Sequence, residues 1–108
     1  MVTTFSSPCQ PSDLWMIDLE SGESIQLTNS LPEEISKAEF VVPEEIQYDG
    51  MDGVGIPALL FRSKQVPAPA VVMIHGGPNW HYSAEWNPIM AHLASRGYVV
   101  LCPNYRGS

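Results

Sequence analysis

Hydrophobic and polar positions change their pattern about a third of the way along the chain. Two strand-like stretches come first, Asp13–Leu19 and Ser24–Thr28, and the turn sequence Glu20–Glu23 separates them. Two such stretches around a Ser-Gly turn predict a β-hairpin. Because an isolated hairpin is only marginally stable in water, we expect this one to belong to a larger sheet.

A connector follows the hairpin. Residues Asn29–Glu45 are rich in glutamate and are interrupted by Pro32 and Pro43, which is typical of a solvated linker. We therefore expect a domain boundary here, with residues 1–40 forming the end of one domain and its linker, and residues 41–108 the beginning of a second.

The second half has the pattern of an α/β sheet. Glu45–Asp49 and Ile56–Arg62 predict two short strands around a glycine-rich turn. Ala70–Ile74 and Tyr98–Cys102 are continuous apolar runs. Such runs are typical of strands buried on both faces of a parallel or mixed sheet.

A helix is predicted between these two apolar strands. Asn87 can cap it, Pro88 suits its first position, and Gly97 can end it in the left-handed conformation. Its apolar positions follow helical spacing and predict a core-facing stripe rather than a cofactor site: Trp86, Ile89, Met90, Leu93 and Ala94. Strand, helix and strand in this order predict a crossover unit with parallel strands, so the expected order after the hairpin is β-β-β-α-β.

Composition and charge exclude several classes of function. Apolar residues make up 44% of the 108 residues, which is enough for a packed core, and the net charge of −7 argues against nucleic-acid binding. The apolar runs are too short to cross a membrane, and no basic and apolar leader follows Met1. Cys9 and Cys102 lie in different surroundings and do not predict a disulfide. We therefore expect a cytoplasmic protein that does not bind membranes.

The turn after the first apolar strand is the main candidate for chemistry. Gly76 and Gly77 have no Cβ, so their backbone can approach a ligand closely, and Pro78 would make the turn rigid. A fixed, exposed N–H in such a turn can stabilise an oxyanion, and losing one such donor typically costs about 3–4 kcal/mol of transition-state stabilisation. A tight strand-to-helix turn without chemistry explains the same residues equally well. The glycine patterns of dinucleotide-binding and phosphate-binding loops are absent from the sequence.

Four segments together resemble the prolyl oligopeptidase family of serine peptidases, in particular its acylaminoacyl-peptidase and dipeptidyl-peptidase branch. The motif His75–Pro78 follows a buried strand, and Gly97–Ser108 follows one helix later. Pro11–Thr28 resembles the last blade of that family's β-propeller, and Pro43–Arg62 resembles the first strands of its α/β-hydrolase domain. The resemblance implies an α/β fold that comprises the N-terminal part of an α/β-hydrolase sheet, preceded by a propeller hairpin.

The resemblance also implies roles for the turn. The N–H of Gly77 would be the first oxyanion donor, and the N–H of the residue after the nucleophile would be the second. Gly76 would shape the turn, and His75 would orient the loop by hydrogen bonding. A role of His75 as general base is disfavoured, because the hydrolase order places the catalytic histidine last in the chain.

Further residues are expected around the same cleft. Asn104, Tyr105 and Arg106 match the family's loop after the next strand, and we expect that loop to line or brace the site. Tyr105 and Arg106 are therefore candidate substrate contacts. Trp80 and His81 are also candidates, although surface decoration explains His81 equally well.

The nucleophile is missing from these 108 residues, since no G-x-S-x-G motif occurs and neither Ser83 nor Ser95 has the flanking glycines of a nucleophile elbow. We therefore expect an excerpt of a longer hydrolase that cleaves peptides, inactive by itself. The resemblance implies that the strand leading to the nucleophile pairs beside Ala70–Ile74, so we expect this strand to present an open, apolar edge in the excerpt. Two alternatives stay open, an esterase of the same fold and a non-catalytic interaction protein on the same scaffold. No cofactor is expected, the three histidines match no zinc pattern, and whether the protein forms homo-oligomers stays open.

Overall fold

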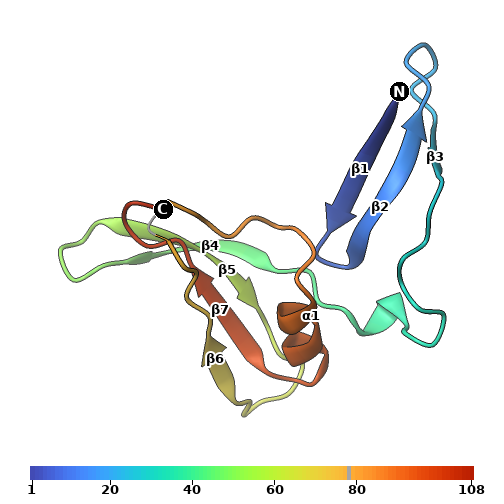
Figure 1. Cartoon of the computed structure of the whole chain (residues 1–108). Helices are drawn as coiled ribbons and strands as arrows, with labels where there is room; N and C mark the ends of the chain where they lie inside the picture. The colour runs from blue at the N-terminus through green and yellow to red at the C-terminus, as the bar shows by residue number, and fades with distance from the viewer. Residues whose placement is uncertain (78) are drawn as a thin grey trace.

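The computed structural model describes residues 1–77 and 79–108, with the exception of the Ala38 side chain, and arranges the strands in two sheets (Figure 1). The first sheet has the order β1-β2-β3 and the second has the order β4-β5-β7-β6. The bounds of the elements are β1 Val2–Ser7, β2 Gln10–Ile17, β3 Ser24–Gln26, the 3₁₀ helix η1 Lys37–Glu39, β4 Glu44–Asp49, β5 Gly55–Phe61, β6 Ala70–Val72, α1 Pro88–Ser95 and β7 Val99–Pro103.

The first sheet contains the predicted hairpin. Strands β2 and β3 pair antiparallel, and the turn between them closes with a 2.9 Å hydrogen bond from the Gly22 N–H to the Asp18 carbonyl. Gly22 has a φ of +75°, which glycine adopts without strain. Strand β1 was not predicted, because its Thr- and Ser-rich sequence lacks an alternating apolar pattern. It pairs antiparallel with β2.

Asp13 ties the connector to this sheet. Its side chain is 2% exposed, and one carboxylate oxygen accepts hydrogen bonds from the Thr28 hydroxyl at 2.8 Å and from the Ser30 N–H and hydroxyl at 2.9 Å each. The other oxygen accepts from Gln26 Nε2 at 3.1 Å. Burial alone would raise the pKa of Asp13, but these donors outweigh it and lower the pKa. The carboxylate therefore anchors the point where the chain leaves the sheet.

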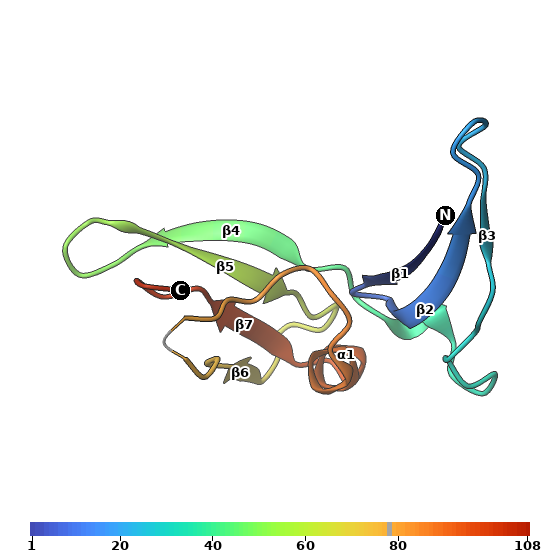
Figure 2. The same ribbon diagram turned by 45° about the horizontal axis from the view of Figure 1, so that its top comes forward.

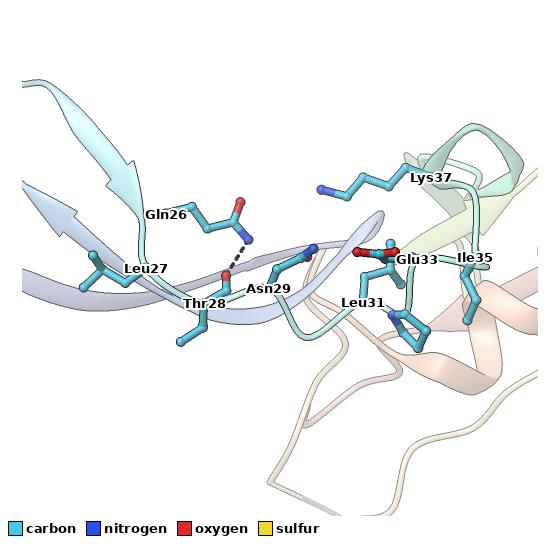
Figure 3. A pocket seen from close by; sticks show the side chains of 9 residues that line it. Gln26, Leu27, Thr28, Asn29, Leu31, Glu33, Ile35 and Lys37 are labelled. Carbon is cyan, nitrogen blue, oxygen red and sulfur yellow. Dashed lines mark hydrogen bonds between the residues drawn. The ribbon is translucent and has the colours of Figure 1, made fainter.

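A pocket of about 430 Å³ lies next to this anchor, where the chain passes from β3 to η1 (Figure 3). Gln26 lines it from the sheet side and donates to the Thr28 carbonyl at 2.7 Å, while Glu33 and Lys37 line it from the connector. The pocket belongs to the connector and is separate from the strand ends described below.

The second sheet is mixed and contains the predicted crossover. Strands β4 and β5 are antiparallel, as are β5 and β7, whereas β6 and β7 are parallel and are joined through α1. The parallel pair confirms the strand–helix–strand prediction. The core lies between this sheet and the helix and consists of Leu59, Phe61, Met90, Ala94, Val100 and Cys102.

Helix α1 begins as predicted. The Asn87 side chain accepts hydrogen bonds from the N–H groups of Ile89 and Met90, and Pro88 occupies the first turn. The predicted core stripe is wrong at one position, because Ile89 is 60% exposed whereas Ala91 is buried. The physical reason is that α1 packs on β7 along Met90 and Ala94, which turns Ile89 away from the sheet.

Strand β6 differs from its prediction. The expected strand Ala70–Ile74 was predicted to be buried on both faces, but the strand ends at Val72, and Val72 and Ile74 are 58% and 69% exposed. The prediction of burial is wrong because β6 is the edge strand of the sheet and pairs only with β7 (Figure 2). The strand therefore presents an open, apolar edge.

The helices in the described part of the chain are all too short or too polar to span a membrane. Cys9 and Cys102 are both free thiols.

Candidate active site

Two loops meet at one edge of the second sheet. Because β6 and β7 are parallel, their carboxyl ends point in the same direction, which is where ligands bind in open α/β sheets. Residues 73–77 leave β6 there, and residues 104–108 leave β7. The Met73 N–H continues the pairing with a 2.9 Å hydrogen bond to the Leu101 carbonyl, so the first loop begins in a fixed position.

His75 is the central side chain of this edge. It is 4% exposed, and both ring nitrogens have partners: Nδ1 lies 2.8 Å from the Gly76 carbonyl, and Nε2 lies 2.8 Å from the Ser108 hydroxyl. A carbonyl oxygen only accepts, so Nδ1 carries the proton of this contact. The Ser108 hydroxyl lies between Nε2 and the Tyr105 carbonyl, which is 2.6 Å away, and its single proton can serve only one of these two acceptors. The imidazole thus ties the first loop to the second, a geometry that favours loop orientation over proton transfer to a substrate.

Aromatic side chains surround the imidazole. The Tyr105 ring stacks on it with centroids 4.3 Å apart and an interplanar angle of 16°. Trp80 and Tyr82 meet it edge-on, with centroids at 6.5 Å and 5.4 Å. Trp80 is 60% exposed and available to a ligand, whereas burial raises the pKa of Tyr82 and keeps its phenol neutral. Tyr105 donates its only proton to the His75 carbonyl at 3.0 Å, so it braces the loop.

The two glycines of the turn differ in a way that the sequence did not show. Neither has a φ in the left-handed region. A Cβ on Gly77 would lie 3.1 Å from the Tyr105 hydroxyl and 3.2 Å from the Asn79 nitrogen, whereas a Cβ on Gly76 would meet open space. The crowding at Gly77, rather than an unusual φ, is what favours glycine there. Pro78, which was predicted to make the turn rigid, lies outside the described residues.

Gly77 is an exposed residue, and within residues 1–77 and 79–108 its backbone N–H has no hydrogen-bond acceptor. The same holds for Gly76. An exposed amide in a loop whose neighbours are tied down is the feature that an oxyanion donor needs.

Asn104 holds the far end of the first loop. Its side chain accepts a 2.7 Å hydrogen bond from the Tyr82 N–H and donates a 2.9 Å hydrogen bond to the Tyr82 carbonyl. Sequence reasoning placed Asn104 in a bracing loop without a specific partner. Its position directly after the last residue of β7 was the one available signal.

The structure places His81 in a groove and Arg106 in an ion pair. His81 lines a groove of about 510 Å³ together with Asn104, Tyr82 and the strands β4 and β5. Arg106 pairs with Asp52 in the β4–β5 turn at 2.5 Å, and this guanidinium lowers the pKa of Asp52. Both members of the pair are more than half exposed, so Arg106 stays accessible, but its charge already has a partner.

Other reactive groups do not gather at this edge. Burial raises the pKa of Cys102 to about 11, so its thiol stays protonated at neutral pH and is a poor nucleophile. In the described residues no three His, Cys, Asp or Glu side chains come together as a metal site.

Comparisons with known proteins agree with this geometry. A family model described as the dienelactone hydrolase family matches residues 56–107. An uncharacterized peptidase, YuxL, from Bacillus subtilis is 34% identical over 99% of this chain, and the human acylamino-acid-releasing enzyme is 39% identical over 60% of it. The sequence is therefore similar to those of named peptidases, in agreement with the resemblance to the prolyl oligopeptidase family. It spans 17% of the Bacillus subtilis relative and 9% of the human one.

Solved structures of this prolyl oligopeptidase group show the same fold. A puromycin-hydrolyzing peptidase of Mycobacterium tuberculosis superimposes with a TM-score of 0.82 and 26% identity, covering 96% of this chain and 17% of that protein. The acylaminoacyl peptidase of Pyrococcus horikoshii gives a TM-score of 0.78 at 26% identity, covering 99% of this chain and 17% of that one. The predicted resemblance and the α/β-hydrolase fold class are therefore confirmed.

Proposed function

We propose that residues 75–77 supply the oxyanion loop of a serine peptidase whose nucleophile lies in a part of the protein outside these 108 residues. The serine hydroxyl would attack the carbonyl carbon of a peptide bond and pass its proton to a histidine base. The amine would leave with that proton, and water would then hydrolyse the acyl-enzyme. The Gly77 N–H would donate to the oxyanion of both tetrahedral intermediates.

The observation that carries this proposal is that Gly77 is exposed and its N–H has no acceptor among the described residues, in a loop that several hydrogen bonds hold in place. The His75 ring and carbonyl, the Gly76 carbonyl and the Tyr82 peptide all have partners within the described residues. The N–H of Gly77 has no such partner among the described residues, so it can donate to a ligand. The family resemblance and the lack of room for a Cβ favour Gly77 over Gly76.

The substrate would be a short peptide or an aminoacyl amide. Support comes from the relatives, one named an acylamino-acid-releasing enzyme and one named a puromycin-hydrolyzing peptidase. Trp80 and Tyr105 would contact the substrate beside the loop, and His81 and Arg106 would contact its more distant parts. Residues 1–40 would end a propeller domain, and residues 41–108 would begin the catalytic domain.

Esterase activity is the second candidate, because the matching family model is that of dienelactone hydrolases. The ratio of kcat/KM for an anilide and for the ester of the same acyl group separates the two. A peptidase retains measurable turnover of the anilide, whereas an esterase cleaves only the ester.

The experiment is an assay of the full-length protein with acetyl-alanine p-nitroanilide, alanine p-nitroanilide and puromycin, together with labelling by a fluorophosphonate. We expect hydrolysis of at least one of these amides and labelling of one serine outside the 108 residues. The 108-residue chain alone is the control and should show neither hydrolysis nor label. Full-length protein without amide hydrolysis and without label would contradict the proposal and favour an interaction protein.

A further inference from the structure

We infer that Asn104 is a positioning residue, whose side-chain amide fixes the Tyr82 peptide and thereby the loop that carries Gly77. This inference rests on the function proposed for that loop. In this inference Asn104 does not contact the substrate. Its role is to keep the backbone N–H of Gly77 in the position where it would bind the oxyanion.

The contact itself is unusually complete for one side chain. Asn104 Oδ1 accepts from the Tyr82 N–H at 2.7 Å, and Nδ2 donates to the Tyr82 carbonyl at 2.9 Å. These are the two bonds that a neighbouring β-strand residue would offer in an antiparallel pair. The side chain therefore supplies the hydrogen bonds that a neighbouring strand would give to the Tyr82 peptide.

The anchor is itself rigid. The Asn104 N–H donates to the Pro57 carbonyl at 2.8 Å, which continues the pairing of β7 with β5 beyond the end of β7. A side chain mounted on a central strand has little freedom, so it transmits the position of the sheet to the loop.

The other end of the loop is held from the same segment. Tyr105 donates to the His75 carbonyl at 3.0 Å, and the Ser108 hydroxyl lies 2.8 Å from His75 Nε2. His75 and Tyr82 are thus each held by residues 104–108, and Gly77 lies in the chain between these two contacts. Releasing the Asn104 contact, which we call the Asn104 clamp, frees one end of this span and lets the Gly77 amide move.

At neutral pH, only a side-chain amide of this size can both accept from the Tyr82 N–H and donate to the Tyr82 carbonyl. Alanine removes both hydrogen bonds. Aspartate keeps the shape, but its ionised carboxylate can accept from the Tyr82 N–H and repels the Tyr82 carbonyl. A protonated aspartate donates and accepts as the amide does, so the aspartate variant recovers the clamp as the pH falls.

The test compares N104A and N104D with the full-length unmodified protein, using an amide substrate that the protein hydrolyses. Because a misplacement of about 1 Å can cost about 100-fold in rate, we expect N104A to lower kcat by roughly 10- to 100-fold while KM changes by less than about threefold.

N87A is the matched control, since Asn87 also receives two backbone hydrogen bonds, at 3.1 and 3.2 Å, but caps α1. N87A should lower the melting temperature and leave kcat unchanged. The inference is overturned if N104A keeps the kcat of the unmodified protein. It is also overturned if N104A and N87A lower the melting temperature equally and N104A loses no more kcat than N87A.

The aspartate variant supplies a readout that a merely structural role would not change. The ratio of kcat for N104D to kcat for the unmodified protein should rise as the pH falls from about 8 towards about 5, because aspartate ordinarily titrates near pH 4 and the carbonyl raises that value. Glu45, His81 and Tyr82 line the same groove as Asn104 and are present in both proteins of this ratio, which therefore reports the change at residue 104. A ratio independent of pH contradicts the clamp.

Hydrogen–deuterium exchange separates this inference from the proposed function. The Tyr82 amide should be protected in the unmodified protein and in N104D, and should exchange at least tenfold faster in N104A. If the unmodified protein hydrolyses no amide, the proposed function fails, and the exchange data still decide whether the clamp exists. If the Tyr82 amide exchanges at the same rate in N104A and in the unmodified protein, the clamp is refuted even where the enzyme is active.

Discussion

Tyr105 holds His75 in two independent ways: its ring stacks on the imidazole at 4.3 Å, and its hydroxyl donates to the His75 carbonyl at 3.0 Å. The two residues are separated by 30 positions in the chain and come from the loops after β6 and β7. This contact joins the ends of two parallel strands at the place where the catalytic amide is proposed.

The two contributions of Tyr105 can be separated by substitution. Y105F removes the hydrogen bond and keeps the stacking, and we expect it to cost about 1 kcal/mol, or roughly fivefold in kcat/KM for amide hydrolysis. Y105A removes both and should cost about 1 kcal/mol more. Steady-state kinetics of the full-length variants measure both losses in kcat/KM. Full activity in Y105F would show that the hydroxyl does not hold the loop.

Asp13 should make the first sheet sensitive to acid. The folded state holds the pKa of this carboxyl below its unfolded value of about 3.9, so its contribution to stability is complete at neutral pH. That contribution is lost as the pH falls through the lower, folded pKa. We expect D13N to lower the urea midpoint at about pH 7 and to show little further difference from the unmodified protein near pH 2.

The control for this prediction is D49N, since Asp49 is exposed at the end of β4. Tryptophan fluorescence during urea unfolding of the full-length variants gives the midpoints. A D13N midpoint equal to that of D49N at neutral pH would refute the anchoring role of Asp13.

The open edge of β6 predicts poor behaviour of the chain by itself. Val72 and Ile74 are 58% and 69% exposed on a strand that has one free edge, which invites association between copies. We expect the 108-residue chain, expressed alone, to aggregate and to bind a hydrophobic dye. The double variant V72K/I74K should increase the monomeric fraction in size-exclusion chromatography.

L19K is the control for this edge, because Leu19 is 74% exposed but lies in the β2–β3 turn. It adds a charge without protecting β6 and should leave aggregation unchanged. A monodisperse monomer with a sharp, cooperative thermal transition in the unmodified chain would contradict the prediction.

Local signals in the sequence predicted most of the elements. The cap at Asn87, the turn at Gly22 and the continuous apolar run of β7 depend on neighbouring residues, and all three are present in the fold. The open edge of β6 was predicted from the strand order that the family resemblance implies, and not from the local apolar pattern. Whether a strand is central or at an edge depends on which other strands pair with it, and the apolar pattern of β6 is that of a central strand.

The candidate site was predicted in position but not in its contacts. The motif around Gly77 located the loop. The pairing of Asn104 with Tyr82 spans 22 positions, and the pairing of Arg106 with Asp52 spans 54. Such contacts arise only when the sheet brings distant loops together, so no local pattern indicates them. For the same reason the sequence did not indicate that the Arg106 guanidinium pairs with Asp52.

The most direct measurement for the central claim is the rate of amide hydrolysis by G77A in the full-length protein. A Cβ at residue 77 would lie 3.1 Å from the Tyr105 hydroxyl and 3.2 Å from the Asn79 nitrogen, so the Tyr105 side chain or the loop backbone must give by a few tenths of an ångström. Alanine keeps the N–H but displaces the loop that aims it, and because one oxyanion donor is worth about 100- to 1,000-fold in kcat, we expect a loss of up to that size with a nearly unchanged KM. G76A, whose Cβ would meet open space, should lose much less. If G77A keeps the kcat of the unmodified protein, the Gly77 amide does not stabilise the oxyanion.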